Sequence, residues 1–317
     1  VILASSPHPF AGLAGWLLAK IKRARFIFEV RDLWPQTFVE IGGYSNKSPV
    51  VKLVRVLEKF LYRRAKKIVV LMPRASEYIT GLGIPSSKIV YIPNGVSPEL
   101  FSDTGVELPG ELDETISDLK SNGKLLVGLT GAHGIHDALD TIIEAARLLR
   151  DKGANSVHFL LIGDGTEKER LMRKATDHSL INVTFHPQVP KKAMPALLKT
   201  LDIAVMCRRK TGLYKYGMST LKLWDYMMAA KPIVWAINSA VDPVAEAGCG
   251  ITVPPEDAEE MAKAIIKLCD LSDEERKEMG TRGYEYVMKY HSVPVLADRL
   301  LEAIEDTKPS AHLAMPC

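Results

Sequence analysis

The sequence predicts an α/β protein of two units, each built on a parallel β-sheet. Strand-like and helix-like segments alternate along the 317 residues, and the strand candidates are continuously apolar. Continuous apolar strands are typical of parallel sheets that helices cover on both faces. A stretch without a strong strand, residues 97–123, divides the chain into two parts of ordinary domain size.

The strand candidates are ten short apolar segments, and helical periodicity marks several longer segments between them. The predicted strands are residues 1–4, 26–30, 67–71, 89–92, 125–129, 157–162, 183–185, 203–207, 233–237 and 251–253. The helical segments include residues 48–64, 137–152, 168–177 and 194–200.

The boundary region, from Ser97 to Gly123, is rich in proline, glycine and acidic residues. We therefore predict a partial amino-terminal domain at residues 1–108 and a second domain at 109–285. Residues 286–317 are predicted to form a helix and tail that pack back on the first domain. Because residues 1–4 are already typical of a buried strand, we expect further sequence to precede them in the native protein.

The composition is that of a globular protein, with 47% hydrophobic and 25% charged residues. A net charge of +3 gives no reason to expect nucleic acid. The four cysteines lack the spacing of a disulfide framework or a zinc site, which favours reduced thiols. Neither a transmembrane run nor a signal-peptide pattern is present in the sequence. We therefore expect a cytoplasmic protein.

The most informative motif is residues 217–232, GMSTLKLWDYMMAAKP. Ser219 and Thr220 precede an apolar helical run as N-cap residues do, and Lys222 and Asp225 share one face of that helix. A cation at a helix start suits a phosphate, and a carboxylate one turn later can accept hydrogen bonds from a sugar diol. This pattern outlines a nucleotide-sugar site. The alternative is a surface helix with an ordinary ion pair.

Ligands of open α/β sheets bind beyond the carboxyl ends of the strands. Gly131 and Gly134 follow one predicted strand, and such glycines let backbone amides approach an anion. His133 is a candidate phosphate contact there, unless the turn simply exposes its histidines. Gly163 begins a Gly-Asp-Gly turn after the next strand, which is weak evidence alone. The sequence contains neither GxGxxG nor Asp-x-Asp, so it predicts neither a dinucleotide site nor a metal-bound diphosphate.

Charged residues follow two further strands. The basic triplet around Arg209 follows residues 203–207 and is either a solvated turn or a phosphate contact. Arg31, Asp32 and Trp34 follow residues 26–30 and indicate either a cleft site or a buried ion pair beside a core indole.

The segment from Ser48 to Lys67 is typical of a basic amphipathic helix. Together with Lys47 just before it, eight cations accompany one acid, Glu58. Such helices bind anionic lipid surfaces. A helix that covers the sheet with a solvated outer face fits the same pattern, and the two interpretations are compatible.

Together these segments resemble family-4 glycosyltransferases of the GT-B fold, and in particular bacterial enzymes of the fucosaminyltransferase type. The matching segments follow the family order over most of residues 1–290. They are VILASSPHPFAGLAGWLLAK, FIFEVRDLWPQTFVEIGG, LEKFLYRRAKKIVVL, IVYIPNGV, LLVGLTGAHGIHDALDTIIEAA, FLLIGDGTEKERL, LDIAVMC, STLKLWDYMMAAKPIV and AEAGCGITVPPED.

The resemblance implies two Rossmann-like domains, the first incomplete, with the nucleotide sugar bound by the second domain and the acceptor by the first. It implies no metal and no cofactor, the UDP-sugar being a substrate. The motifs and the resemblance together give Asp32, Arg209 and Lys222 as catalytic candidates. Donor-side candidates are Gly131, His133, Gly134, Gly163, Gln188, Val189, Leu221 and Asp225, and acceptor-side candidates are Ser6, His8, Arg31, Asn94 and Gly95.

Several positions depart from the family pattern. Gly217 replaces the first Glu of Glu-x7-Glu, Ala132 and Asp137 replace a usual Arg and Lys, and Ala230 replaces a Gly. The resemblance implies retaining transfer of a hexosamine-type sugar from UDP to a saccharide acceptor, lipid-linked and at the inner membrane face. The alternatives are a non-catalytic nucleotide-sugar-binding subunit and a UDP-N-acetylglucosamine epimerase.

Overall fold

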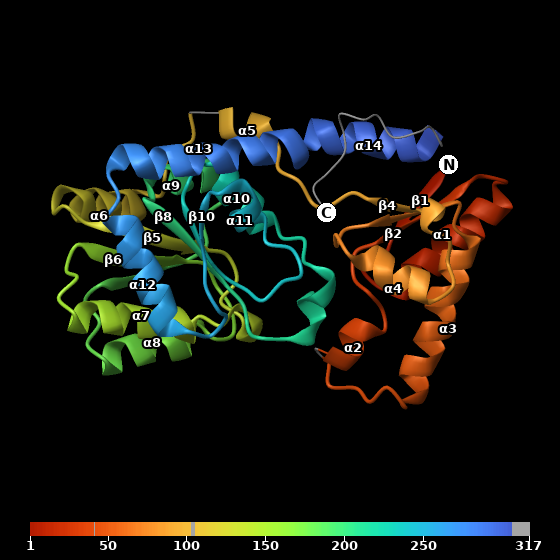
Figure 1. The fold of residues 1–317 in the computed structure, drawn as a ribbon, viewed down its shortest axis with the longest axis horizontal. Helices are drawn as coiled ribbons and strands as arrows, with labels where there is room; N and C mark the ends of the chain where they lie inside the picture. The colour runs from red at the N-terminus through yellow and green to blue at the C-terminus, as the bar shows by residue number, and fades with distance from the viewer. Residues whose placement is uncertain (41, 103–104, 306–317) are drawn as a thin grey trace.

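The computed structural model describes residues 1–40, 42–102 and 105–305, which form two α/β domains side by side (Figure 1). The first contains a four-stranded sheet of order β1-β2-β3-β4, and the second a six-stranded sheet of order β10-β9-β8-β5-β6-β7. Every strand pair is parallel, as the continuous apolar strands predict. Each of the ten predicted strands is present, with its ends displaced by at most one residue.

The first domain alternates strands and helices in chain order. Its elements are β1 (Ile2–Ser5), α1 (Pro9–Ile21), β2 (Phe26–Val30), α2 (Gln36–Glu40), α3 (Pro49–Arg64), β3 (Lys67–Val70), α4 (Ala75–Gly81) and β4 (Ile89–Tyr91).

The second domain continues the alternation around a larger core. Its elements are α5 (Pro98–Ser102), α6 (Gly110–Ser121), β5 (Leu125–Thr130), α7 (Asp140–Asp151), β6 (Val157–Ile162), α8 (Lys168–Asp177), β7 (Val183–His186), α9 (Met194–Thr200), β8 (Ile203–Cys207), α10 (Leu221–Met228), β9 (Ile233–Ala236), α11 (Pro243–Ala247), β10 (Gly250–Thr252), α12 (Ala258–Cys269) and α13 (Asp273–Tyr290).

The chain passes from one core to the other within a few residues. Ile92 packs in the core of the first domain, whereas Val96 is buried in the second. Phe101 of α5 also packs against the second core. The crossing therefore comes earlier than the predicted boundary after residue 108, because the acidic and proline-rich stretch that suggested a linker carries apolar side chains that the second domain buries.

A last helix, α14 (Val293–Glu305), returns to the first domain. Its Leu296 packs with Ile27 and Val69 of the first sheet, and Figure 1 shows α13 and α14 running along one side of both domains. Pro294 lies in the first turn of α14, where proline is tolerated because that position needs no amide donor. The predicted tail after residue 305 lies outside the described residues.

Helix α3 buries its only acid. Glu58 is 3% exposed and accepts hydrogen bonds from Tyr62 Oη at 2.9 Å and from Tyr78 Oη at 2.8 Å. Glu58 therefore does not lie on the solvated outer face with the cations, because two phenols hold it in the core. Burial raises the pKa of Glu58 to about 8, against the opposing effect of the two phenol hydrogen bonds.

We expect Glu58→Gln to flatten the dependence of stability on pH. Between pH 4.5 and about 8 the folded protein keeps a proton on Glu58 that the unfolded chain has lost, so the free energy of unfolding falls as pH rises. The glutamine cannot titrate, which removes a slope of up to roughly 1.4 kcal/mol per pH unit. Urea unfolding at pH 5.5 and pH 8 measures it, with the exposed Glu169→Gln as control. Equal slopes in wild type and Glu58→Gln would contradict the assignment.

Candidate functional site

The site is built around the start of α10, where the predicted side-chain cap is absent. Thr220 occupies the N-cap position, but its side chain makes no capping hydrogen bond. Ser219 instead turns to the first domain, where its Oγ accepts a hydrogen bond from the Asn94 amide at 2.9 Å. Among the described residues, the amides of the first turn of α10 therefore have no side-chain acceptor, and such amides favour an anion.

Two glycine turns face this helix start. Gly131, with φ +108°, follows β5, and Gly163 follows β6. A Cβ on Gly163 would lie 1.8 Å from the carbonyl oxygen of Gly131, and a Cβ on Gly131 would lie 2.4 Å from Cε of Lys222. Glycine therefore allows the two turns to touch and lets the Lys222 side chain lie directly over them.

In the turn after β5, the amides of Gly131 and Gly134 already have hydrogen-bond acceptors. The Gly131 amide donates to the Ile162 carbonyl at 2.8 Å, and the Gly134 amide donates to Oδ2 of Asp137 at 3.1 Å. The expectation that both glycine amides are open to an anion is therefore wrong for this state of the loop. An anion could reach the Gly134 amide only after the Asp137 carboxylate moves away.

His133 is buried, contrary to both interpretations of this turn. It is 0% exposed, its ring stands edge-on to Phe185, and neither ring nitrogen has a hydrogen-bond partner among the described residues. Burial, together with the nearby cations Lys168 and Lys222, lowers the pKa of His133 to about 4. A neutral imidazole is therefore packed behind the turn.

An ionic cluster surrounds the Lys222 ammonium. Lys222 Nζ lies 3.4 Å from Oδ1 of Asp137, which also pairs with Arg208. Burial lowers the pKa of Lys222, and Asp137 opposes that shift. Arg208, and not the predicted Arg209, therefore belongs to this cluster, because the Arg209 side chain is exposed. The alternative of an ion pair between Lys222 and Asp225 is not what the structure shows, since the ammonium faces Asp137.

A cavity of about 640 Å³ is lined by Gly131, against which the Lys222 side chain lies. Five of the eight predicted donor-side residues line it, from three separate segments. The complete lining is Leu100, Phe101, Gly131, Ile162, Gln188, Val189, Pro190, Lys191, Met194, Leu221 and Asp225. The sequence did not predict the contribution of α5, because its apolar residues lie in the proline- and glycine-rich boundary region. We call this cavity the donor pocket.

Asp225 is the titratable acid of the donor pocket. Burial raises the pKa of Asp225 to about 6, and Lys191 opposes the shift. The group is therefore ionised at neutral pH and can accept two hydroxyl hydrogen bonds.

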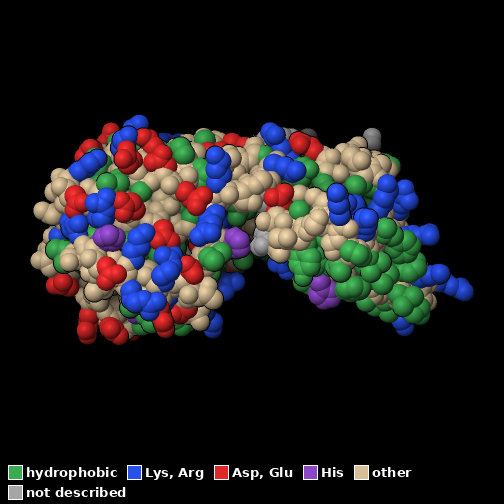
Figure 2. Space-filling view, turned by 90° about the horizontal axis from the view of Figure 1, so that it is seen from below, with side chains coloured by type: hydrophobic (Ala, Val, Ile, Leu, Met, Phe, Trp, Pro, Cys, Tyr) green, Lys and Arg blue, Asp and Glu red, His purple; other side chains and the backbone are tan. Residues whose placement is uncertain are grey.

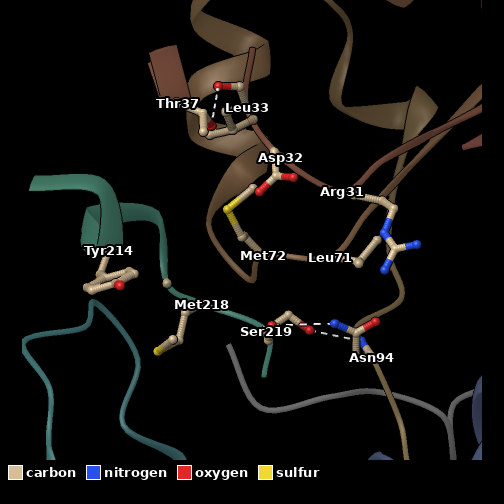
Figure 3. Close-up of a pocket in the computed structure, with 11 residues that line it drawn as sticks. Arg31, Asp32, Leu33, Thr37, Leu71, Met72, Asn94, Tyr214, Met218 and Ser219 are labelled. Carbon is tan, nitrogen blue, oxygen red and sulfur yellow. Dashed lines mark hydrogen bonds between the residues drawn. The ribbon is translucent and has the colours of Figure 1, made fainter. Parts of the chain in front are cut away.

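A second cavity, of about 250 Å³, lies between the two domains, and we call it the interdomain cavity (Figure 3). Figure 3 shows Asp32 and Met72 of the first domain together with Tyr214 and Met218 of the second. Burial raises the pKa of Asp32, and the neighbouring Arg31 opposes the shift. The complete lining is Arg31, Asp32, Leu33, Thr37, Leu71, Met72, Asn94, Tyr214, Gly217, Met218 and Ser219.

The remaining acceptor-side candidates lie outside that lining. Ser6 is buried and its Oγ accepts a hydrogen bond from the Arg31 amide at 3.2 Å. His8 is exposed before α1. Gly95 packs at the crossing, where a Cβ would lie 2.6 Å from the His291 carbonyl oxygen. Ser6 therefore supports the arginine backbone, and Gly95 permits close packing.

One segment, residues 217–221, contributes to the lining of both cavities. Gly217, Met218 and Ser219 line the interdomain cavity, whereas Leu221 lines the donor pocket. An elongated ligand that occupies both must therefore pass over the uncapped start of α10 and beside Lys222.

Comparison with known families identifies both halves of this arrangement. Residues 124–270 match the family described as "Glycosyl transferases group 1", and residues 1–95 match the "Glycosyl transferase 4-like domain". The second domain is thus similar to the group 1 glycosyltransferase domain, and the first to the 4-like domain. The family resemblance is thus confirmed at this level.

Curated relatives agree with this assignment. The probable glycosyltransferase WbjE of Pseudomonas aeruginosa is 23% identical over 78% of this chain and 60% of its own length. The putative colanic acid biosynthesis glycosyl transferase WcaI of Escherichia coli is 26% identical over 66% of this chain and 51% of its own length. The 2-deoxystreptamine N-acetyl-D-glucosaminyltransferase of Streptomyces fradiae is 24% identical over 79% of this chain and 58% of its own length. The chain therefore spans between half and two thirds of each relative.

Solved structures share the fold. Anabaena HepE in complex with UDP has a TM-score of 0.74 at 16% identity, covering 96% of this chain and 79% of that one. Sucrose-phosphate synthase from Thermosynechococcus elongatus has a TM-score of 0.73 at 17% identity, covering 96% of this chain and 73% of that one. The predicted GT-B fold of two parallel-sheet domains is confirmed.

We expect the affinity for UDP-glucose to fall about tenfold from pH 7 to pH 5, because protonation of Asp225 removes its acceptor charge. UDP-glucose is a suitable ligand because its diphosphate, esterified at both ends, does not titrate in this range. Calorimetry at several pH values measures the effect. Asp225→Asn should bind more weakly at pH 7 and with little pH dependence, whereas the exposed Asp298→Asn should behave as wild type. A pH-independent wild-type affinity would refute the role of Asp225.

Proposed function

We propose that the protein transfers a sugar from a UDP-sugar to a saccharide acceptor in the synthesis of a cell-surface polysaccharide. The observation that carries this proposal is that residues of one short segment, 217–221, line both cavities and lead into the start of α10. The donor pocket supplies an acid for the ribose, the helix start supplies uncapped amides, and Lys222 supplies a cation between them. The solved structures of HepE in complex with UDP and with UDP-glucose agree with this class of donor.

The proposed reaction breaks the bond between the anomeric carbon and the diphosphate of the donor. Negative charge then grows on the leaving UDP, and Lys222 with the first-turn amides of α10 stabilises it. The acceptor hydroxyl attacks from the face that the UDP leaves and passes its proton to a departing phosphate oxygen, which retains the anomeric configuration. Asp32, in the interdomain cavity, orients the acceptor hydroxyl. The scheme requires no metal ion.

The donor sugar is proposed to be a hexosamine. This rests on the resemblance to the fucosaminyl type and agrees with the N-acetylglucosaminyl transfer in the name of the Streptomyces relative. The acceptor is proposed to occupy the interdomain cavity, where Arg31 and Asn94 supply polar contacts. A non-catalytic subunit would bind the donor without turnover, and an epimerase would need no acceptor, so an acceptor-dependent assay separates all three.

The lipid-linked character of the acceptor is supported by the surface of the first domain. Residues 1–67 contain 13 Lys and Arg but 4 Asp and Glu, leaving 28 basic and 34 acidic residues for the other 250 positions. Apolar side chains of α1 and α3 are exposed beside these cations, among them Ile21 at 68% and Val56 at 68% (Figure 2). Apolar groups combined with cations bind anionic bilayers. No helix within the described residues has the length and apolarity to span a bilayer.

We expect Lys222→Ala to lower turnover by roughly 100- to 1,000-fold, the usual effect of removing one donor to a developing oxyanion. The assay measures sugar transfer in the full-length protein, and the exposed Lys210→Ala is the control. Turnover within threefold of wild type would remove Lys222 from the mechanism. Addition of EDTA should leave wild-type turnover unchanged, and its loss would contradict the metal-free scheme.

We expect the protein to float with vesicles containing anionic phosphatidylglycerol and not with neutral phosphatidylcholine vesicles. Replacement of Leu53 and Val56 on α3 by serine should weaken binding roughly tenfold, since two exposed apolar side chains are lost. The matched control is Leu301→Ser, an exposed leucine on α14. Equal flotation with both vesicles, or an unaffected double variant, would remove the lipid surface from the proposal.

A further inference from the structure

Asp137 is a charged residue of this site for which the proposed reaction has no use. Its carboxylate pairs with Arg208, lies 3.4 Å from Lys222 Nζ and accepts the Gly134 amide at 3.1 Å. Its side chain is only 8% exposed. One buried carboxylate therefore takes two cations and one backbone amide of a glycine turn.

These donors are of the types that proteins use to hold a phosphate. They come from separate segments: Gly134 from the turn after β5, Arg208 from the end of β8, and Lys222 from the first turn of α10. Lys222 also lies against Gly131, which lines the donor pocket. The Asp137 carboxylate thus occupies a converging set of anion-binding groups at the edge of that pocket.

We propose that Asp137 is an internal counter-ion, which holds the diphosphate-binding groups in the empty protein and which the donor diphosphate displaces from Lys222 and Arg208. This inference rests on the proposed function, because it assumes a nucleoside diphosphate ligand. The diphosphate of a UDP-sugar carries two negative charges and a carboxylate carries one, so the ligand is the better partner for two cations. Displacement also frees the Gly134 amide for a phosphate oxygen.

Asp137 stabilises the site without a ligand and weakens the binding of the donor. In the empty site it separates two neighbouring cations that would otherwise repel each other, and it opposes the loss of the Lys222 proton that burial favours. On donor binding its pairs with these cations must be replaced, which lowers the affinity for the diphosphate. Asp137 therefore sets how tightly the donor and the UDP product bind.

The test is Asp137→Asn, which keeps the shape of the side chain and an acceptor for the Gly134 amide but removes the charge. We expect UDP to bind about tenfold more tightly, which corresponds to roughly 1.4 kcal/mol. Uridine, which has no phosphate, should bind as to wild type, whereas a variant that merely loosened the loop would change both affinities. The matched control is Asp140→Asn, whose carboxylate pairs instead with Arg170 and Lys174.

The outcomes separate this proposal from the one it rests on. If wild type binds neither UDP nor a UDP-sugar, the proposed function fails. If wild type binds UDP but Asp137→Asn binds it equally or more weakly, the counter-ion proposal alone is overturned. A crystal of the wild type with UDP tests it even if the variant does not fold. Lys222 Nζ should then bind a phosphate oxygen, and an ammonium still paired with Asp137, with no phosphate within about 4 Å, would overturn the proposal.

Discussion

The geometry of the site depends on the contact between the turns that follow β5 and β6. Gly163 lies so close to the Gly131 carbonyl that no other side chain fits between them, and neighbouring strand ends therefore form one continuous wall. The aliphatic part of Lys222 lies on this wall, which brings its ammonium to Asp137. A cation with a long flexible side chain is held in this way by backbone packing, at little further cost in side-chain entropy.

The start of α10 is positioned by both domains. Just before it, Ser219 accepts the Asn94 amide of the first domain, and the Tyr216 carbonyl accepts the Arg74 amide at 3.0 Å. Gly217, with φ +84°, lies where a Cβ would be 2.4 Å from Pro73. Separation of the domains would break these contacts and shift the segment that carries Lys222. The donor-binding groups and the acceptor cavity are therefore mechanically coupled through residues 217–221.

The strands and sheet type were predictable because parallel strands buried on both faces are continuously apolar, a pattern that needs no knowledge of distant contacts. It was harder to predict which side chain of a segment enters the site. Consecutive residues of an extended chain point to opposite sides, so a basic triplet after β8 does not tell whether Arg208 or Arg209 turns inward. The burial of His133 and Glu58 was not predictable for a related reason, since it depends on Phe185 and on Tyr78, which lie 52 and 20 positions away.

Comparison of aligned motif positions alone underestimates the positive charge of this site. Judged along the sequence, Asp137 replaces a family cation and weakens a diphosphate site. In the fold, Arg208 reaches Asp137 from the end of β8, because β5 and β8 are neighbours in the sheet and their carboxyl ends converge. The site therefore retains two cations and gains an acid between them. Cations supplied by one segment can be replaced from another wherever strand ends meet, so the quantity to compare between relatives is the charge around the pocket, not the residue at one aligned position.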